Sequence, residues 1–332
     1  MGGLNQKNRI LCVYKILNNK SDEEHPISAN YIINELSLLG YDVDRKTVYS
    51  DIEALNTFGV EVIHTDFPKR GYFLSDRIFQ VSEISLLIDA VLSANFITPK
   101  KTEQLVSKLR GFLSIYQAQK INKNTHIGNR KKCDNEEIFY NIDTLKKSID
   151  EGKKVSFDYY KYILKSGHFI QKVSKKMKVS PYALVWEDDH YYLVCNNEKY
   201  DNLMHLRLDK ISKVTKSNEI SRHFSQVSEY REEFNVSDYA SKTFNMFSGT
   251  EETVTLRCKT DILNIVVDKF GNDIFVRSSD NDCFVFDSKV YISNGLIHWL
   301  LSFGNEIEVI KPIHLREKMK ASIKETAENY SK

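Results

Sequence analysis

The sequence predicts an α+β protein of several domains, and three patterns in its apolar residues support this. Apolar residues recur at helical spacing within residues 6–58 and again within residues 81–116. From residue 153 onward they alternate with a period of two, and after residue 250 strand-like and helix-like stretches succeed one another. We expect a winged helix-turn-helix head (1–77), a helical connector and linker (78–134), a small β-barrel (135–220) and a ferredoxin-like extension (221–332).

The predicted head consists of three short helices and a hairpin. The first helix covers residues 6–19, and the second and third begin after the N-caps Ser28 and Asp44. Residues 60–74 alternate around a Pro- and Gly-containing turn, which indicates a two-stranded hairpin. A winged helix-turn-helix has this order and lays its last helix in the major groove of DNA. The buried face of that helix is predicted to be Val48, Ile52 and Leu55, with Phe58 as a further candidate.

The outward side of this helix and the hairpin tip carry side chains suited to DNA. Arginine and lysine reach guanine acceptors or phosphates, whereas tyrosine, threonine and serine mostly donate to phosphates. One such cluster makes few phosphate contacts, so we expect a homodimer on a two-fold double-stranded DNA operator. The candidate DNA-binding residues are Arg45, Lys46, Thr47, Tyr49 and Ser50 on the helix, and Lys69 and Arg70 on the hairpin.

The charge of the head favours an alternative. Residues 1–71 contain eight Lys or Arg and ten Asp or Glu, a net charge of −2, whereas a DNA-binding domain is usually basic. A protein-interaction module therefore remains open for this region. Residues 120–178, by contrast, contain fifteen basic and seven acidic residues, a net charge of +8, which indicates an anionic partner.

The connector is predicted to contain two helices and a linker. One helix begins near Val81, and another begins at Pro99 and continues through Tyr116. Residues 120–136 are polar and lack capping signals, which indicates a linker. Since no polar constellation accompanies these helices, a connector with a subunit interface is favoured over a catalytic domain.

The following region is predicted to form a small, strongly bent barrel. A helix ends at Gly152, and about five short strands with tight turns follow. Its central motif is VSPYALVWEDDHYYLV at residues 179–194, followed by LRLDKI at residues 206–211. Together these residues resemble the WYL-domain transcriptional regulators of bacteria. The name-giving triplet falls on Tyr191-Tyr192-Leu193, so Tyr replaces Trp, and the order of head, connector and barrel matches as well.

The resemblance implies an Sm-like barrel that binds a nucleic acid, a nucleotide or another anionic effector and relays its occupancy to the head. An arginine can pair with phosphate through two hydrogen bonds, hydroxyl groups can donate, and aromatic rings can stack on a base. The sequence does not decide which of Tyr191 and Tyr192 faces the pocket. The candidate effector-binding residues are Ser180, Tyr182, His190, Tyr192 and Arg207.

Several of these residues also have purely structural alternatives. Arg207 could form a salt bridge, Ser180 could set the turn before a proline, and His190 could sit at a loop tip. A set of lysines would either extend a basic surface or protect an edge strand. These are Lys172, Lys175, Lys176 and Lys178.

The C-terminal region has the predicted order β-α-β-β-α-β, which is typical of a ferredoxin-like fold. That fold serves many functions and does not decide this one. Residues 299–306 resemble the C-terminal extension of WYL-domain regulators, and we expect them to help form the dimer and close the sensor. A core helix without a separate task is the alternative.

Other function classes lack their signatures. The five cysteines contain no C-x-x-C pair and the nine histidines no H-E-x-x-H spacing, so we expect no metal and no cofactor. No secretory signal or membrane-length apolar run is present, so we expect a cytoplasmic protein without membrane contact. The chain also lacks paired carboxylates at ligand spacing, a phosphate-binding loop and a nucleophile elbow, so we expect no enzyme.

The expected function is a ligand-responsive transcriptional regulator that binds an operator and an anionic effector. A nucleic-acid-associated adaptor without operator binding is the first alternative, and a nucleic-acid-processing enzyme is a less favoured one.

Overall fold

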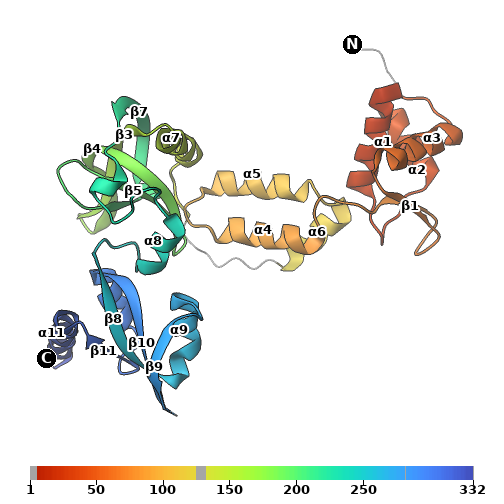
Figure 1. Cartoon of the computed structure of the whole chain (residues 1–332). Helices are drawn as coiled ribbons and strands as arrows, with labels where there is room; N and C mark the ends of the chain where they lie inside the picture. Colours follow the sequence, from red (N-terminus) through yellow and green to blue (C-terminus); the bar gives the residue numbers. More distant parts are fainter. Residues whose placement is uncertain (1–5, 125–131, 281, 332) are drawn as a thin grey trace. The chain divides into compact units, whose positions relative to one another are not determined.

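The computed structural model describes residues 6–124, 132–280 and 282–331. The chain divides into two compact units, Met1–Asp134 and Asn135–Lys332, and both are drawn in Figure 1. Together they make a mixed α+β protein, as predicted. Within the described residues, every helix is too short or too polar to cross a membrane.

The first unit begins with three helices and a hairpin, as the sequence predicted. The helices are α1 (Gln6–Lys20), α2 (Ala29–Leu38) and α3 (Arg45–Phe58), and strands β1 (Val62–Thr65) and β2 (Gly71–Leu74) pair antiparallel. One apolar core joins these elements. Its buried members include Val13, Leu17, Ile32, Leu36, Val48, Ile52, Leu55, Val62 and Leu74.

The predicted helix caps are confirmed, but one predicted core residue is not. The side chains of Ser28 and Asp44 accept hydrogen bonds from the backbone N–H groups at the starts of α2 and α3. Phe58, a candidate for the core, is 85% exposed. It is the last residue of α3, and the chain turns back at Gly59 so that the Val60 N–H donates to the Leu55 carbonyl at 2.9 Å. The following segment therefore packs beside Leu55 and leaves Phe58 uncovered.

An ion pair that was not predicted from the sequence joins α1 to α3. Arg9 donates through Nε and Nη2 to both carboxylate oxygens of Asp51, at 2.7 and 2.8 Å. The Asp51 side chain is almost fully buried. Its position on α3 next to the core face fixes how the two helices are oriented to each other.

The connector contains three helices where two were predicted. These are α4 (Val81–Ser93), α5 (Pro99–Arg110) and α6 (Ile115–Asn124). The predicted long helix breaks after Gly111 because Ser114 caps a new one: its hydroxyl accepts from the Gln117 N–H at 3.0 Å. The predicted linker is also wrong at its start, since residues 120–124 are helical, while residues 125–131 lie outside the described residues.

The second unit begins with helix α7 (Ile138–Asp150) and a five-stranded antiparallel sheet in the order β6-β5-β4-β3-β7. The strands are β3 (Lys153–Lys165), β4 (His168–Glu187), β5 (His190–Asn196), β6 (Met204–Arg207) and β7 (Ile211–Ile220). Five strands were predicted, but they are not all short: β4 alone has 20 residues.

The long strand β4 is what curls this sheet. Its first part pairs with β3 up to Val179, and its second part pairs with β5 from Ser180 onward. The register shifts between Pro181 and Ala183, as expected where a proline lacks the N–H group that a ladder needs. The strand therefore serves two halves of one bent sheet (Figure 1).

The C-terminal part follows the predicted β-α-β-β-α-β order. Its four strands form an antiparallel sheet in the order β11-β8-β10-β9, and a helix α11 ends the chain. Strand β10 extends to Ile292, five residues beyond the predicted end at Asp287, and helix α8 (Val236–Lys242) was not predicted. The elements are β8 (Thr250–Lys259), α9 (Leu263–Phe270), β9 (Phe275–Ser279), β10 (Cys283–Ile292), α10 (Asn294–Leu301), β11 (Ile307–Lys311) and α11 (Ile313–Tyr330).

Candidate nucleic-acid interface and effector site

The start of α3 presents a polar, exposed face. Arg45, Lys46, Tyr49 and Ser50 are exposed there, while Val48 on the other side is fully buried. Arg45 Nε donates to the Asn30 side chain on α2 at 2.8 Å, which holds the arginine stem against the neighbouring helix. Four of the five residues predicted on this helix are therefore available to a partner.

The fifth predicted residue, Thr47, is occupied by the helix cap. Its backbone N–H and its hydroxyl both donate to the Asp44 carboxylate, at 2.8 and 2.7 Å. These two bonds hold the pKa of Asp44 below its ordinary value. Thr47 therefore stabilises the first turn of α3, and Asp44 adds a negative charge beside the basic residues.

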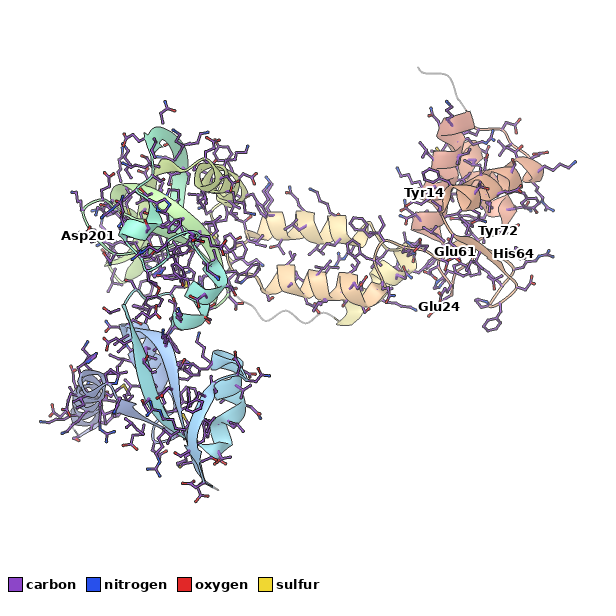
Figure 2. All side chains as sticks on the ribbon, viewed as in Figure 1. Tyr14, Glu24, Glu61, His64, Tyr72 and Asp201 are labelled. Carbon is purple, nitrogen blue, oxygen red and sulfur yellow. The ribbon has the colours of Figure 1, made fainter. Side chains whose placement is uncertain are left out.

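The hairpin carries the other predicted DNA-binding residues. Lys69 and Arg70 are exposed in the turn between β1 and β2. Arg70 lies 3.6 Å from Asp66, but both side chains are more than 80% exposed, so this ion pair is weak. Ring contacts link the hairpin to α3: the Tyr72 ring packs edge-on to His64 with centroids 4.9 Å apart, and its centroid lies 6.1 Å from that of Tyr49. Tyr72 and His64 are labelled in Figure 2. The spacing of apolar residues could not predict the contact between Tyr49 and Tyr72, because these residues lie on two different elements.

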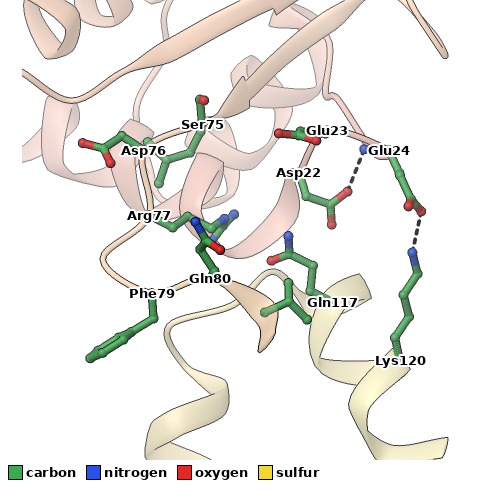
Figure 3. A pocket seen from close by; sticks show the side chains of 12 residues that line it. Asp22, Glu23, Glu24, Ser75, Asp76, Arg77, Phe79, Gln80, Gln117 and Lys120 are labelled. Carbon is green, nitrogen blue, oxygen red and sulfur yellow. Dashed lines mark hydrogen bonds and ion pairs between the residues drawn. The ribbon is translucent and has the colours of Figure 1, made fainter. Parts of the chain in front are cut away.

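A cavity of about 490 Å³ lies where the head meets the connector (Figure 3). Arg77 Nη2 donates there to the backbone carbonyls of Asn18 and Ser21, at 2.9 and 2.6 Å. Burial lowers the pKa of this guanidinium. Asp22 accepts from the Ser114 hydroxyl of the connector. Arg77 Nη1 also donates to the Phe112 carbonyl, at 3.3 Å. The bonds of Arg77 to Phe112 and of Asp22 to Ser114 attach the three-helix head to the connector.

Two of the five predicted effector residues are held by the backbone. Ser180 is fully buried, and its hydroxyl accepts from the Arg222 N–H at 2.9 Å. The Tyr182 hydroxyl donates to the Arg222 carbonyl at 2.9 Å, and burial raises the pKa of this tyrosine to about 12. Both side chains therefore fasten the segment after β7 to strand β4.

The other three predicted effector residues lie close together on the curled sheet. Tyr192 and Arg207 are register partners on β5 and β6, and the rings of Tyr192 and His190 are 6.2 Å apart. Tyr191 instead meets Trp186 edge-on at 6.2 Å. Since alternate residues of a strand point to opposite faces, Tyr192 is the tyrosine on the side of Arg207.

Arg207 is paired with an acidic neighbour. Its Nε and Nη2 atoms donate to the two carboxylate oxygens of Asp209, at 3.0 and 2.7 Å, and its side chain is 31% exposed. Burial lowers the pKa of Arg207, but the bonds to Asp209 outweigh this and leave it raised. An incoming anion must therefore compete with Asp209.

Comparison with known proteins assigns two domains in this unit. The family model described as "WYL domain" matches residues 140–216, and that described as "WCX domain" matches residues 250–327. The second unit therefore contains a WYL domain and a WCX domain. The WYL match covers most of the curled sheet and most of α7, and the WCX match covers the second sheet and most of α11.

Whole-chain comparisons add little to this assignment. No curated protein matches the chain. Among solved structures, proteasome accessory factor B/C (PafBC) of Arthrobacter aurescens is 11% identical with a TM-score of 0.28, over 98% of this chain. This chain spans only 49% of the PafBC chain. A CRISPR Cas-related protein is 14% identical with a TM-score of 0.35, over 100% of this chain and 88% of that one. Both scores are too low for conclusions about a shared arrangement.

A basic cavity of about 460 Å³ lies on strands β3, β4 and β7 of the WYL domain. Lys176, Lys178 and Lys213 line it, together with Asp158. Lys213 lies 3.4 Å from Asp158, and Lys178 is bonded to Glu219. Two of the lysines predicted to extend a basic surface therefore lie in one hollow of the sheet.

The WYL and WCX domains are joined by a buried apolar cluster and by a lysine. The cluster takes Val185 and Val194 from the curled sheet and Tyr291 from the second sheet. Lys269 on α9 lies 3.8 Å from Glu187 at the end of β4 and 4.6 Å from the centre of the Phe244 ring. The end of β4 is therefore in direct contact with the WCX domain.

Proposed function

We propose that this WYL-domain protein is a homodimeric, DNA-binding transcriptional regulator. Its first unit acts as a winged helix-turn-helix with α3 in the major groove, and its second unit combines an Sm-like WYL barrel with a ferredoxin-like WCX domain. The observation that carries the proposal is the exposed start of α3, where Arg45, Lys46, Tyr49 and Ser50 stand together. A helix start also directs N–H groups and a partial positive charge at phosphates.

The proposed effector is an anion with a planar ring, either a nucleotide or a short single-stranded nucleic acid. It pairs with Arg207 and stacks on Tyr192, with His190 beside it. The lysine-lined cavity on the same sheet continues the basic surface for a longer strand. Through β4, Glu187 and Lys269, the occupied barrel shifts the WCX domain and with it the subunit pairing.

DNA binding is tested by selecting genomic fragments with the purified full chain and footprinting the best of them. Arg45→Ala and Lys46→Ala are each expected to weaken binding to the selected site by about tenfold or more, since a good base contact contributes about 1–3 kcal/mol. Lys100→Ala is the matched control, because Lys100 is an exposed lysine on α5. If no fragment is enriched, or if all three variants bind equally, the regulator is not supported.

The same variants separate the regulator from the adaptor that the acidic head suggests. An adaptor without operator binding would show no DNA affinity to lose, and its partner binding would be unchanged by Arg45→Ala. Footprints of two-fold symmetry would support the regulator and its homodimer together.

A further inference from the structure

A second cavity in this unit has a chemistry opposite to that of the proposed effector site. It encloses about 460 Å³ between the WYL sheet and the WCX sheet. Two buried tyrosines line it, Tyr239 on α8 and Tyr291 on β10, with ring centres 5.2 Å apart. The buried side chains of Leu203 and Val227 complete an apolar wall.

Carboxylates from three separate segments line the rest of this cavity. Asp201 comes from the loop between β5 and β6 (Figure 2), Glu229 from the segment before α8, and Glu251 from strand β8. Glu229 and Glu251 lie next to each other, and the Tyr291 hydroxyl donates to Glu229. Burial and the proximity of Glu251 raise the pKa of Glu229.

Two cations lie next to these three carboxylates. Lys242 lies 3.4 Å from Glu251, but it is closer to Asp238, at 2.8 Å. Arg222 lies 2.8 Å from Asp201. Three carboxylates therefore line the cavity, while its described lining residues include no Lys or Arg, so the cavity carries an excess of negative charge that repels phosphates.

We propose that this cavity binds a small organic cation, an aliphatic chain bearing one or more primary amines. One ammonium group lies between Glu229 and Glu251 and donates to both carboxylates. The methylene groups lie on the faces of Tyr239 and Tyr291, where a cation is also attracted by the rings. A second ammonium group faces Asp201 at the rim. The volume lies in the range of small-molecule sites, and its apolar wall favours an organic cation over a bare metal ion.

This inference does not rest on the proposed function, because it involves neither α3 nor Arg207. An Arg45 variant that loses DNA binding would still bind the amine. A Glu251 variant that loses amine binding would still bind DNA through α3. The failure of one is therefore distinguishable from the failure of the other.

The test is calorimetric titration of the full chain with 1,4-diaminobutane and with spermidine, against potassium chloride of matched ionic strength. Wild-type protein is expected to show saturable binding of one amine per chain. Glu229→Gln and Glu251→Gln are each expected to weaken it by about tenfold or more, because a charge-assisted hydrogen bond contributes about 1.5–3 kcal/mol. Glu252→Gln is the matched control: it is the next residue on β8 and pairs with His314 at 3.4 Å.

Several results would overturn the proposal. The wild-type protein could give no saturable heat, or the Glu251→Gln variant could bind the amine as tightly as wild type. An equal concentration of Mg²⁺ that displaces the amine would also contradict the proposal. Should a glutamine variant not fold, wild-type protein with ¹³C-labelled tyrosine gives a second readout. The ring signals of Tyr239 and Tyr291 must shift when the amine is added, and shifts confined to other tyrosines would contradict the proposal.

Discussion

At the scale of single residues, short-range partners decide which charged groups are available to a ligand. Arg207 has an acidic neighbour two positions later, and Thr47 is bonded to the cap of its own helix. Arg45 and Lys46, in contrast, are exposed beside a helix start, and Arg45 is bonded there to the uncharged side chain of Asn30. Residue type alone is therefore a poor guide to binding, and the partner of each group has to be known.

The pair of Arg207 and Asp209 makes a prediction about the effector. Arg207→Ala should abolish the response of operator binding to an added nucleotide or oligonucleotide while basal DNA binding stays largely intact. Asp209→Asn should instead strengthen effector binding by about tenfold, because the competing carboxylate charge is gone. Fluorescence anisotropy of a labelled operator, titrated with effector, measures both. Equal loss of basal binding and response in Arg207→Ala would show that Arg207 is structural.

His205 on β6 should make the second unit sensitive to acid. Burial lowers its pKa from 6.5 to about 4, and its Nε2 lies 2.7 Å from the Tyr239 hydroxyl. Between these two values the unfolded chain binds more protons than the folded one, so stability is lost as pH falls from about 6.5 toward 4. At pH 5 the loss is about 2 kcal/mol.

Hydrogen exchange of peptides from β6 and α8 at pH 7 and pH 5, corrected for intrinsic rates, measures this loss. His205→Gln should remove most of the difference between the two pH values. His168→Gln, at an exposed position, should keep it. An unchanged pH dependence in His205→Gln would assign the effect to other groups.

At the scale of elements, the second unit depends on close approaches that a hydrophobic pattern does not reveal. Strand β4 joins two half-sheets because Pro181 interrupts its ladder in the middle. Helix α10 packs so closely on the loop between α8 and β8 that a side chain at Gly295 would have no room. A Cβ atom there would lie 2.1 Å from the Phe244 carbonyl oxygen, which is a backbone atom.

Gly295→Ala should therefore destabilise the WCX domain, although alanine is the better helix former by about 1 kcal/mol. The steric overlap must be relieved by moving α10, and we expect a net loss of about 2–3 kcal/mol. Urea denaturation followed by circular dichroism measures it. Asn294→Ala, at an exposed position in the same helix, should be neutral within about 0.5 kcal/mol. Unchanged or greater stability in Gly295→Ala would mean that the loop moves aside freely.

At the scale of the whole molecule, the proposed regulator needs two chains because each head offers few cations. The predicted DNA-binding set contains only four Lys or Arg residues, Arg45, Lys46, Lys69 and Arg70, in a region of net charge −2. Phosphate contacts produce the steep salt dependence of DNA binding. The number of heads on one site can therefore be read from that dependence.

Lys69→Ala should reduce the salt slope of DNA binding by about one per head, and so by about two for a dimer. The affinity loss should be the same for operator and for unrelated DNA, since a hairpin-tip lysine contacts phosphates and not bases. Binding isotherms at several salt concentrations measure the slope, with Lys100→Ala as the unchanged control. A reduction of only about one would contradict two heads on one site.

The sequence by itself determined the local elements of this protein. Helical periodicity, the caps Ser28 and Asp44, and alternation in the strands depend on residues near one another in the chain, so the three helices, the hairpin and the β-α-β-β-α-β order could be predicted. The motif around Tyr191-Tyr192-Leu193 also placed the WYL domain, which the family model confirms.

Only the tertiary structure decided the properties that depend on distant neighbours. The break between α5 and α6 depends on a cap at Ser114, the exposure of Phe58 on where the hairpin packs, and the side chosen by Tyr192 on its partner strand. The carboxylate-lined cavity unites residues from position 201 to position 291. Burial and pairing across such separations are set by packing, and a pattern along the chain does not contain them.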